Sequence, residues 1–160
     1  MDSDKIYSEA YGQFETKNFD KAFELVEQLK RLAPDYRKAY LLEIRLLDQM
    51  ENYPKLIAAI KNFLPNINFF SSAEKNLAAD LLDLLAHAQT YLAMQEEAMK
   101  NFNLAAQMST DNKYASKRYA SVIYLASHME KFSATDFRIL YAKFQKYLSD
   151  IVPYPKKFYN

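Results

Sequence analysis

Apolar residues recur along this chain with the period of an α-helix. Between residues 95 and 108, apolar residues share one face at Ala98, Phe102, Ala105 and Ala106. Between residues 133 and 151 the same spacing returns, at Phe137, Leu140, Tyr141, Phe144 and Leu148. Residues three, four and seven positions apart lie on one side of a helix and can be buried together. The pattern therefore predicts amphipathic helices.

Capping residues and prolines divide the pattern into eight helices. Residues that favour a helix start or stop stand at the boundaries: Asp2 or Ser3, Asn18, Pro34, Asn52, Pro54, Pro65, Ser71 or Ser72, and Ser133 with Asp136 as a capping-box partner. The expected helices span about 3–16, 19–32, 36–50, 53–64, 72–94, 95–108, 113–129 and 133–151. Eight helices with short links predict an all-α array of antiparallel pairs.

An internal repeat underlies the array. A small or aliphatic residue occupies the same place in three helices, at Ala22, Leu56 and Ala98. Ala22 and Leu56 are 34 residues apart, whereas Leu56 and Ala98 are separated by one such period plus an eight-residue insertion, SSAEKNLA. A helix pair cannot bury its apolar face alone, so a repeated pair predicts stacking into a continuous core with a concave surface lined by the first helices.

The 34-residue period and the segment NFDKAFELVEQLKRLAPDY resemble the tetratricopeptide repeat (TPR). Ala10 and Ala86 stand where paired helices of such a repeat meet closely, and the resemblance implies that Ala22, Ala98, Phe102 and Ala105 are buried. It implies repeats at 3–36, 37–70 and 79–112, a divergent pair at 113–150, a tail or linker at 151–160, and a right-handed superhelix. The second repeat carries Ile44 and Leu56 at tight positions, so its helices should pack less tightly. The alternative is a helical bundle without repeats.

The C-terminal stretch carries a second resemblance. An apolar helix ending in SHMEKFSATD, an aromatic and basic helix, and a tail rich in proline, tyrosine and lysine look like the segment that follows the repeats of bacterial SPINDLY-type O-linked N-acetylglucosamine transferases. In that family a two-lobed catalytic domain follows, whereas this sequence ends at Asn160. The resemblance implies a repeat region belonging or related to a larger transferase.

Composition limits the remaining choices. A single glycine, Gly12, fits a helical chain, and the lack of cysteine excludes a disulfide framework and a thiolate zinc site. The N-terminus has neither the basic nor the apolar region of a secretory signal, and no stretch of about 18 apolar residues is present. We expect no membrane association and a cytoplasmic location.

Charge is unevenly distributed along the chain. Residues 1–111 hold 12 Lys and Arg against 17 Asp and Glu, whereas residues 112–160 hold 9 against 3. Basic and aromatic residues interleave in the later part, at Lys113, Tyr114, Lys117, Arg118, Tyr124, Lys143, Lys146 and Tyr147. Ordinary solvated charges, a docking surface for an acidic or adjoining catalytic domain, and a single-stranded nucleic-acid site are the alternatives, and nucleic acid is not the expected partner.

No set of residues predicts catalysis. His87 and His128 lie on different helices without the spacing of a metal-binding pair, and carboxylate pairs such as Asp80 and Asp83 are expected to be solvated. A glycine-rich phosphate loop and a serine nucleophile motif are missing. We expect no cofactor, no metal and no enzymatic activity of this chain alone.

The candidate binding groove lies on the first helices. Tyr7, Tyr11 and Phe14 share one face, either as anchors for a partner peptide or as packing against a neighbouring helix. The residues predicted to face the groove are Tyr7, Tyr11, Arg45, Asp83, His87, Tyr91 and Tyr124. The leading hypothesis is a protein-interaction module that presents a partner or substrate to a glycosyltransferase-like protein. A free-standing TPR adaptor and a small helical nucleic-acid binder are the alternatives.

Overall fold

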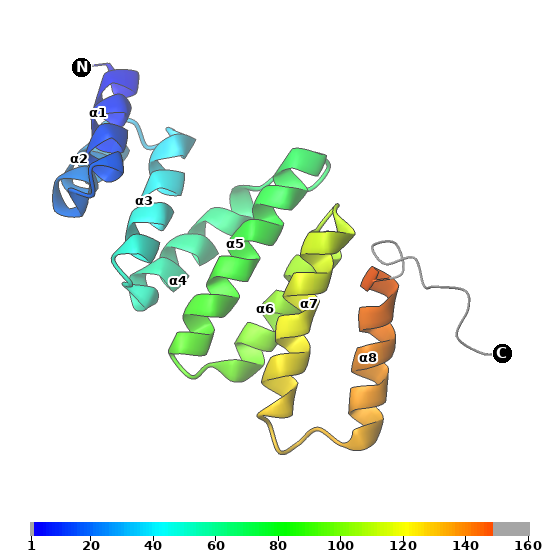
Figure 1. Ribbon diagram of the computed structural model, residues 1–160. Helices are drawn as coiled ribbons and strands as arrows, with labels where there is room; N and C mark the ends of the chain where they lie inside the picture. Colours follow the sequence, from blue (N-terminus) through cyan, green and yellow to red (C-terminus); the bar gives the residue numbers. More distant parts are fainter. Residues whose placement is uncertain (1, 149–160) are drawn as a thin grey trace. The chain divides into compact units, whose positions relative to one another are not determined.

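The computed structural model describes residues 2–148 and consists of helices (Figure 1). They are α1 (Ser3–Glu15), α2 (Phe19–Leu32), α3 (Arg37–Gln49), α4 (Tyr53–Phe63), the 3-10 turn η1 (Leu64–Asn66), α5 (Ser72–Tyr91), α6 (Gln95–Met108), α7 (Asn112–Ser127) and α8 (Ala134–Leu148). No strand occurs in the described part of the chain. The predicted all-α fold with eight helices is confirmed, and most bounds agree within two residues. The predicted end near Ile151 and the segment 151–160 lie outside the described residues.

Capping explains several of these bounds. Ser133 and Asp136 form the expected capping box, since the Ser133 N–H donates to the Asp136 carboxylate at 2.8 Å and the Asp136 N–H donates to the Ser133 hydroxyl at 3.2 Å. Asp2 accepts from the Asp4 N–H at 3.1 Å. The expectation for Asn18 is wrong: it stands at the start of α2, but its side chain donates to Gln13 instead of capping the helix.

The turns between paired helices repeat with the predicted period. Lys17, Glu51 and Ala93 each follow the first helix of a pair with a positive φ, between 52° and 61°. The N–H of the next residue donates five positions back in each case, from Asn18, Asn52 and Met94. This is the Schellman arrangement that ends helices. The spacings between the three turns are 34 and 42 residues, so the period and its eight-residue insertion are features of the backbone as well as of the sequence. The insertion lies mainly in the first turns of α5.

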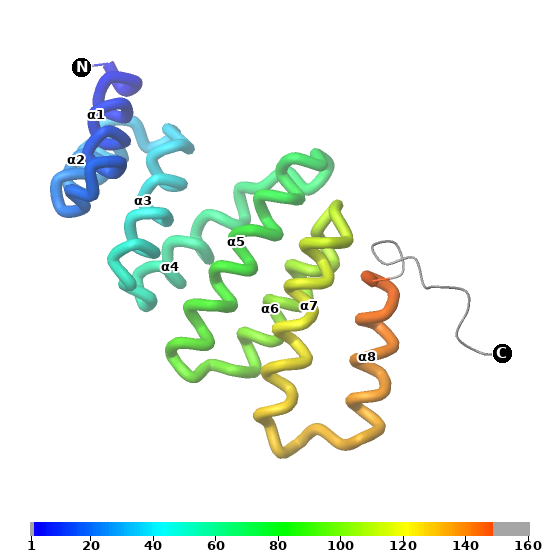
Figure 2. Tube along the Cα trace, viewed as in Figure 1, coloured from blue at the N-terminus to red at the C-terminus, as the bar shows by residue number. Residues whose placement is uncertain are grey.

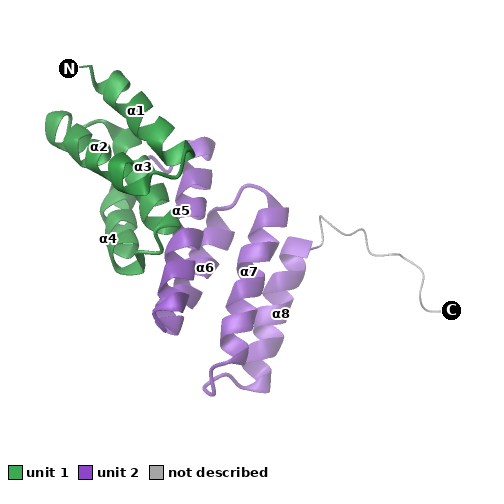
Figure 3. Ribbon diagram, turned by 60° about the vertical axis from the view of Figure 1, so that its left-hand side comes forward, with its two compact units in different colours: residues 1–65 green, residues 66–160 purple. Residues whose placement is uncertain are grey.

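The chain forms two compact units, residues 1–65 and 66–160, and each is described by itself (Figure 3). In unit 1, α1 contacts α2, α2 contacts α3 and α3 contacts α4, with a further contact between α1 and α3. In unit 2, α5, α6, α7 and α8 likewise contact one another in sequence order, and the trace reverses direction at each turn (Figure 2). The predicted antiparallel pairing is therefore confirmed within each unit. The predicted superhelix of the whole chain concerns both units together and stays a prediction.

The cores are built from the residues that the repeat predicts. Ala22, Ala98, Phe102 and Ala105 are buried, as are Ala10 and Ala86 at the close approaches of paired helices. The unit 1 core centres on Ile6, Ala10, Ala22, Val26 and Leu29, and the unit 2 core on Ala86, Ala98, Phe102, Tyr119 and Leu125. Small residues let the backbones of two helices approach closely. Large side chains such as Phe102 fill the space on either side of these close contacts.

Two regions depart from this close packing. In the second repeat, Ile44 and Leu56 are buried, but α3 and α4 contact each other less extensively than α1 and α2 do, as their larger residues predict. On the described part of α8 no residue is fully buried; Leu140, Phe144 and Tyr147 are half-buried against the unit 2 core. The described part of the last pair is thus packed along one half-buried stripe.

Candidate partner-binding surfaces

The seven predicted groove residues fall into two groups. Tyr7, Tyr11 and Arg45 belong to unit 1, whereas Asp83, His87, Tyr91 and Tyr124 belong to unit 2. All of them lie on first helices of pairs, namely α1, α3, α5 and α7.

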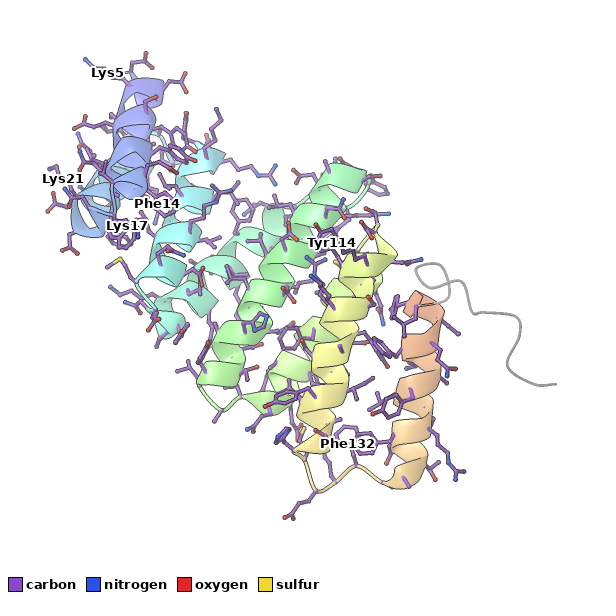
Figure 4. The ribbon with its side chains drawn as sticks, in the orientation of Figure 1. Lys5, Phe14, Lys17, Lys21, Tyr114 and Phe132 are labelled. Carbon is purple, nitrogen blue, oxygen red and sulfur yellow. The ribbon has the colours of Figure 1, made fainter. Side chains whose placement is uncertain are left out.

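In unit 1, aromatic rings follow one another along α1. Tyr7 stacks on Tyr11 with centroids 6.2 Å apart, and Tyr11 lies 6.1 Å from Phe14. The row continues at both ends, to Tyr36 at 5.7 Å from Tyr7 and to Phe19 at 6.0 Å from Phe14. We call these five residues the ring ladder. Phe14 lies near the turn that contains Lys17 (Figure 4).

These aromatic residues pack against neighbouring helices and keep part of their surface exposed. Tyr7, Phe14, Phe19 and Tyr36 each pack one side against the unit 1 core and are only partly buried. Tyr11 is the most exposed member, with 36% of its surface accessible. The rings are consequently fixed from beneath and still present area to solvent, which is the property required of an aromatic anchor.

Two carboxylates hold the hydroxyl groups of the ladder. The Tyr36 hydroxyl donates to Asp4 at 2.5 Å, and this bond raises the pKa of Tyr36 to about 12. A hydrogen bond to Glu15 raises the pKa of Tyr11 from its ordinary value. Both tyrosines therefore remain neutral donors across the ordinary pH range, and their ring orientations are restrained.

Cations from α3 flank the ladder. The Lys38 ammonium lies 5.7 Å from the centroid of the Tyr7 ring, within the range of a cation–π contact. Arg45 is exposed and lies close enough to Tyr11 for its charge to oppose the increase in the pKa of Tyr11. Among the described residues, neither Lys38 nor Arg45 has a carboxylate within ion-pairing distance.

In unit 2, a buried arginine joins α5 to α7. The Arg118 side chain is only 9% exposed, and its guanidinium donates to Asp80 and, at 2.5 Å, to the Ser109 hydroxyl. Its Nε lies 3.8 Å from Asp83 Oδ1. Arginine suits this position because its planar fork can satisfy several acceptors at once. The expectation that Arg118 belongs to an exposed basic surface is wrong, and one cation is removed from that surface.

Two clefts open beside this arginine. One, of about 540 Å³, is lined by the α5 residues Asn76 and Asp80, the α6–α7 turn, Tyr114 and Arg118. The other, of about 220 Å³, is lined by Asp83, His87, Tyr114, Lys117, Arg118 and Ser121. Tyr114 borders both clefts from the first turn of α7 (Figure 4). We call the surface around both clefts the α5–α7 surface.

The two aspartates of this surface differ. Asp80 is 69% exposed, as expected for a solvated charge, whereas Asp83 is 31% exposed. Burial raises the pKa of Asp83, and the charges of His87 and Arg118 oppose that increase. The His87 Nε2 lies 4.0 Å from Asp83, and its ring meets Phe102 edge-on with centroids 4.9 Å apart. Asp83 thus lies between His87, which packs on the core residue Phe102, and the buried cation of Arg118. The prediction that both aspartates are solvated is therefore wrong for Asp83.

Of the four predicted residues in unit 2, Asp83 and His87 line a cleft together. Tyr91 and Tyr124 are largely exposed and line neither cleft; the Tyr124 ring packs against His128 at 4.5 Å. The sequence analysis assigned Arg118 and Tyr114 to the basic and aromatic residues of the later part of the chain. It did not predict the ion pair between Arg118 and Asp80. A signal existed, because the 38 residues between Asp80 and Arg118 are one 34-residue period plus about one helical turn.

Residues 2–148 contain no group of three or more His, Cys, Asp or Glu side chains that could hold a metal ion. None of the helices in that range combines the length and apolar character needed to cross a membrane.

Comparisons with known proteins bear on the fold. No family model matches the chain, and no curated protein matches its sequence. Solved structures do: MamA from Desulfovibrio magneticus RS-1 is 13% identical, with a TM-score of 0.68 over 92% of this chain and 75% of that one. MamA MSR-1 is 18% identical, with a TM-score of 0.68 over 95% and 80%.

The fold is of the tetratricopeptide-repeat type. A third structure, MamA AMB-1, agrees, with 18% identity and a TM-score of 0.68 over 92% of this chain and 72% of that one. The alternative of a bundle without repeats is therefore excluded. At these identities the likeness concerns the fold alone, and none of these comparisons shows a link to a glycosyltransferase.

Proposed function

We propose that this chain is a protein-interaction module that holds a segment of a partner protein on the first helices of its repeats. The observation that carries the proposal is the α5–α7 surface, where Arg118 fixes two neighbouring first helices beside open clefts. A surface ordered during folding loses little further entropy when a partner binds. Tyr114 supplies aromatic area of the kind that is enriched at protein interfaces, and Lys117 and His87 add polar groups beside the clefts.

The partner context follows from the C-terminal resemblance. We propose that the module presents a partner or substrate to a glycosyltransferase-like protein, either within one polypeptide or as a separate subunit. The basic residues of α7 and α8, such as Lys113 and Lys143, would then meet an adjoining catalytic domain. A free-standing adaptor is the alternative, and the reading frame beyond Asn160 in the natural gene distinguishes the two.

Site-specific photo-crosslinking tests the binding surface. A photoreactive phenylalanine analogue would replace Tyr114 beside the clefts, Lys143 on α8, or Lys61 as a control, an exposed residue of α4 that lines neither cleft. The proposal expects a cross-linked partner from position 114 and none from position 61. Capture that occurs only at position 143 would place the function in the C-terminal helices and refute the assignment to the α5–α7 surface.

Salt provides a second criterion. A contact made mainly by exposed lysines weakens steeply between low and moderate salt, because its charges are screened within about 10 Å at 0.1 M ionic strength. A contact anchored by aromatic side chains weakens less. Retention of the position-114 cross-link at the higher salt concentration is the result that we expect.

A further inference from the structure

The ring ladder of unit 1 has the features of a second binding surface with its own preference. We propose that it binds an extended, acidic segment of a partner protein that carries apolar side chains at alternate positions. This inference rests on the proposed function in that the occupant is a protein segment, but it depends on unit 1 alone and not on the α5–α7 surface.

The spacing of the rings favours an extended occupant. Successive ring centroids in the ladder are 5.7 to 6.2 Å apart. In an extended chain, side chains on the same face recur every two residues, a distance of about 6.6 Å. Each alternate apolar side chain can therefore meet a successive ring or the gap beside it. In a helical occupant, side chains four residues apart also rise by about 6.0 Å, but each is rotated by about 40° around the helix from the one before, so a helix could meet only two or three successive rings.

The charge around the rings favours an acidic occupant. Lys38 stands beside Tyr7, and Arg45 stands near Tyr11 on the same side of α1. Both cations lie seven residues apart on α3, so they share a face and are about 10 Å apart along the helix axis. Because neither is paired with a carboxylate among the described residues, both can receive acidic side chains from a bound segment.

The carboxylates that bind the ladder hydroxyls limit where acidic side chains of the occupant can lie. Asp4 accepts the Tyr36 hydroxyl at one end of the ladder, and Glu15 is hydrogen-bonded to Tyr11, the middle ring, on which the charge of Arg45 also acts. Acidic side chains of the occupant would be repelled beside Asp4 and Glu15 and attracted by Lys38, which lies at Tyr7 between them, and by Arg45. The surface thus favours acidic side chains near Lys38 and Arg45 and a neutral residue at the Tyr36 end, a pattern that uses repulsion as well as attraction.

The rings are also prepared for binding before any partner arrives. Four members of the ladder pack against the unit 1 core, and the hydroxyls of Tyr36 and Tyr11 are held by carboxylates. Few rotamers are lost when such rings meet a ligand, so most of their buried area contributes to affinity.

A defined peptide tests the proposal. The probe is a fluorescently labelled, end-blocked nonapeptide in which phenylalanine and leucine alternate with serine at the ends and aspartate at the centre. A second probe carries lysine in place of aspartate, and a third has the first probe's composition with its apolar residues grouped together. Fluorescence anisotropy with the full chain should show saturable binding of the first probe and at least about tenfold weaker binding of the other two.

Variants locate the binding. Lys38→Glu with Arg45→Glu should weaken the acidic probe by about tenfold or more, since it removes two attractions and adds two repulsions. Tyr11→Ser should also weaken it, whereas Tyr11→Phe keeps the ring and should bind like the unaltered chain. Lys61→Glu is the matched charge control on unit 1 and should change nothing. All four chains carry exposed substitutions, and equal circular dichroism would confirm that they fold.

The outcomes separate this inference from the proposed function. Binding of the acidic probe that is lost with the α3 cations supports the ring ladder. No saturable binding, equal binding of the lysine probe, or binding unaffected by the variants overturns it. A cross-linked partner at position 114 together with an inert ladder would leave the proposed function standing. Probe binding without that cross-link would refute the α5–α7 assignment alone.

Discussion

Replacement of Arg118 by methionine gives the sharpest test of how unit 2 is held together. The substitution keeps much of the apolar stem but removes the cation that joins Asp80, Asp83 and Ser109. Asp80 is 69% exposed and can turn to water, so it contributes little to the loss. Asp83 is 31% exposed and would stay charged and partly buried without its cation. Removing one partner of a buried pair costs about 3–5 kcal/mol. Because this pair is incompletely buried, we expect about 2–3 kcal/mol of lost stability near pH 7.

The loss should depend on pH with a definite sign. Burial already raises the pKa of Asp83, and the charge of Arg118 opposes that increase. Without Arg118 the folded-state pKa rises further above the unfolded value, so the folded variant binds a proton that the unfolded chain releases. Protonation therefore stabilises the folded variant as pH falls through the raised pKa.

Urea unfolding followed by circular dichroism, near pH 7 and again near pH 4.5, measures both effects. The difference in unfolding free energy between Arg118→Met and the unaltered chain should be smaller at the lower pH. In the double variant Asp83→Asn with Arg118→Met, stability near pH 7 should partly recover and the extra pH dependence should disappear. A loss below about 0.5 kcal/mol, or the same loss at both pH values, would refute the structural role assigned to Arg118.

Three further predictions concern stability and ligand binding. Ala98 is buried where two helices meet, so Ala98→Leu should overpack the site and cost about 1–3 kcal/mol in urea unfolding; an unchanged midpoint would argue against close packing. Ala93 has a φ of 58°, which strains residues other than glycine, so Ala93→Gly should stabilise the chain by about 0.5–1 kcal/mol, whereas the same change at exposed Ala120 within α7 should destabilise it. Calorimetry should show no binding of UDP-sugars to this chain, and a clear isotherm with micromolar affinity would contradict that expectation.

Local signals were enough to predict the helices and their cores. The capping box at Ser133 and Asp136 depends on residues three positions apart, and the bounds of α2 depend on its amphipathic stripe and the proline that follows. Ala22 and Ala98 were predicted to be buried because the repeat places small residues where paired helices meet. The side-chain role of Asn18 was mispredicted: capping would use its side-chain oxygen as an acceptor, but no N–H of α2 donates to that oxygen, and the side-chain amide N–H donates to Gln13.

The polar contacts between first helices could not be predicted from helix periodicity alone. They depend on how one repeat is registered against the next, and a hydrophobic stripe fixes which face is buried without fixing which charges meet across repeats. Arg118 and Asp80 illustrate the difficulty, because each alone has the sequence character of a solvated residue. Arg118 is buried because the register of one repeat against the next places its side chain beside α5.

Sequence separation nevertheless shows a rule in unit 2. Asn76 accepts hydrogen bonds from Thr110, 34 residues later, Glu96 pairs with Lys131 at a separation of 35, and Arg118 reaches Asp80 at 38. These separations are one repeat period, or one period plus up to about a helical turn, as expected when equivalent helices of adjacent repeats lie beside each other. Complementary polar residues at such separations are therefore candidates for structural pairs. Lys117 lies on the same helix as Arg118 and lines a cleft while remaining exposed, so of two neighbouring cations on one first helix, one is buried between the repeats and the other stays at the surface.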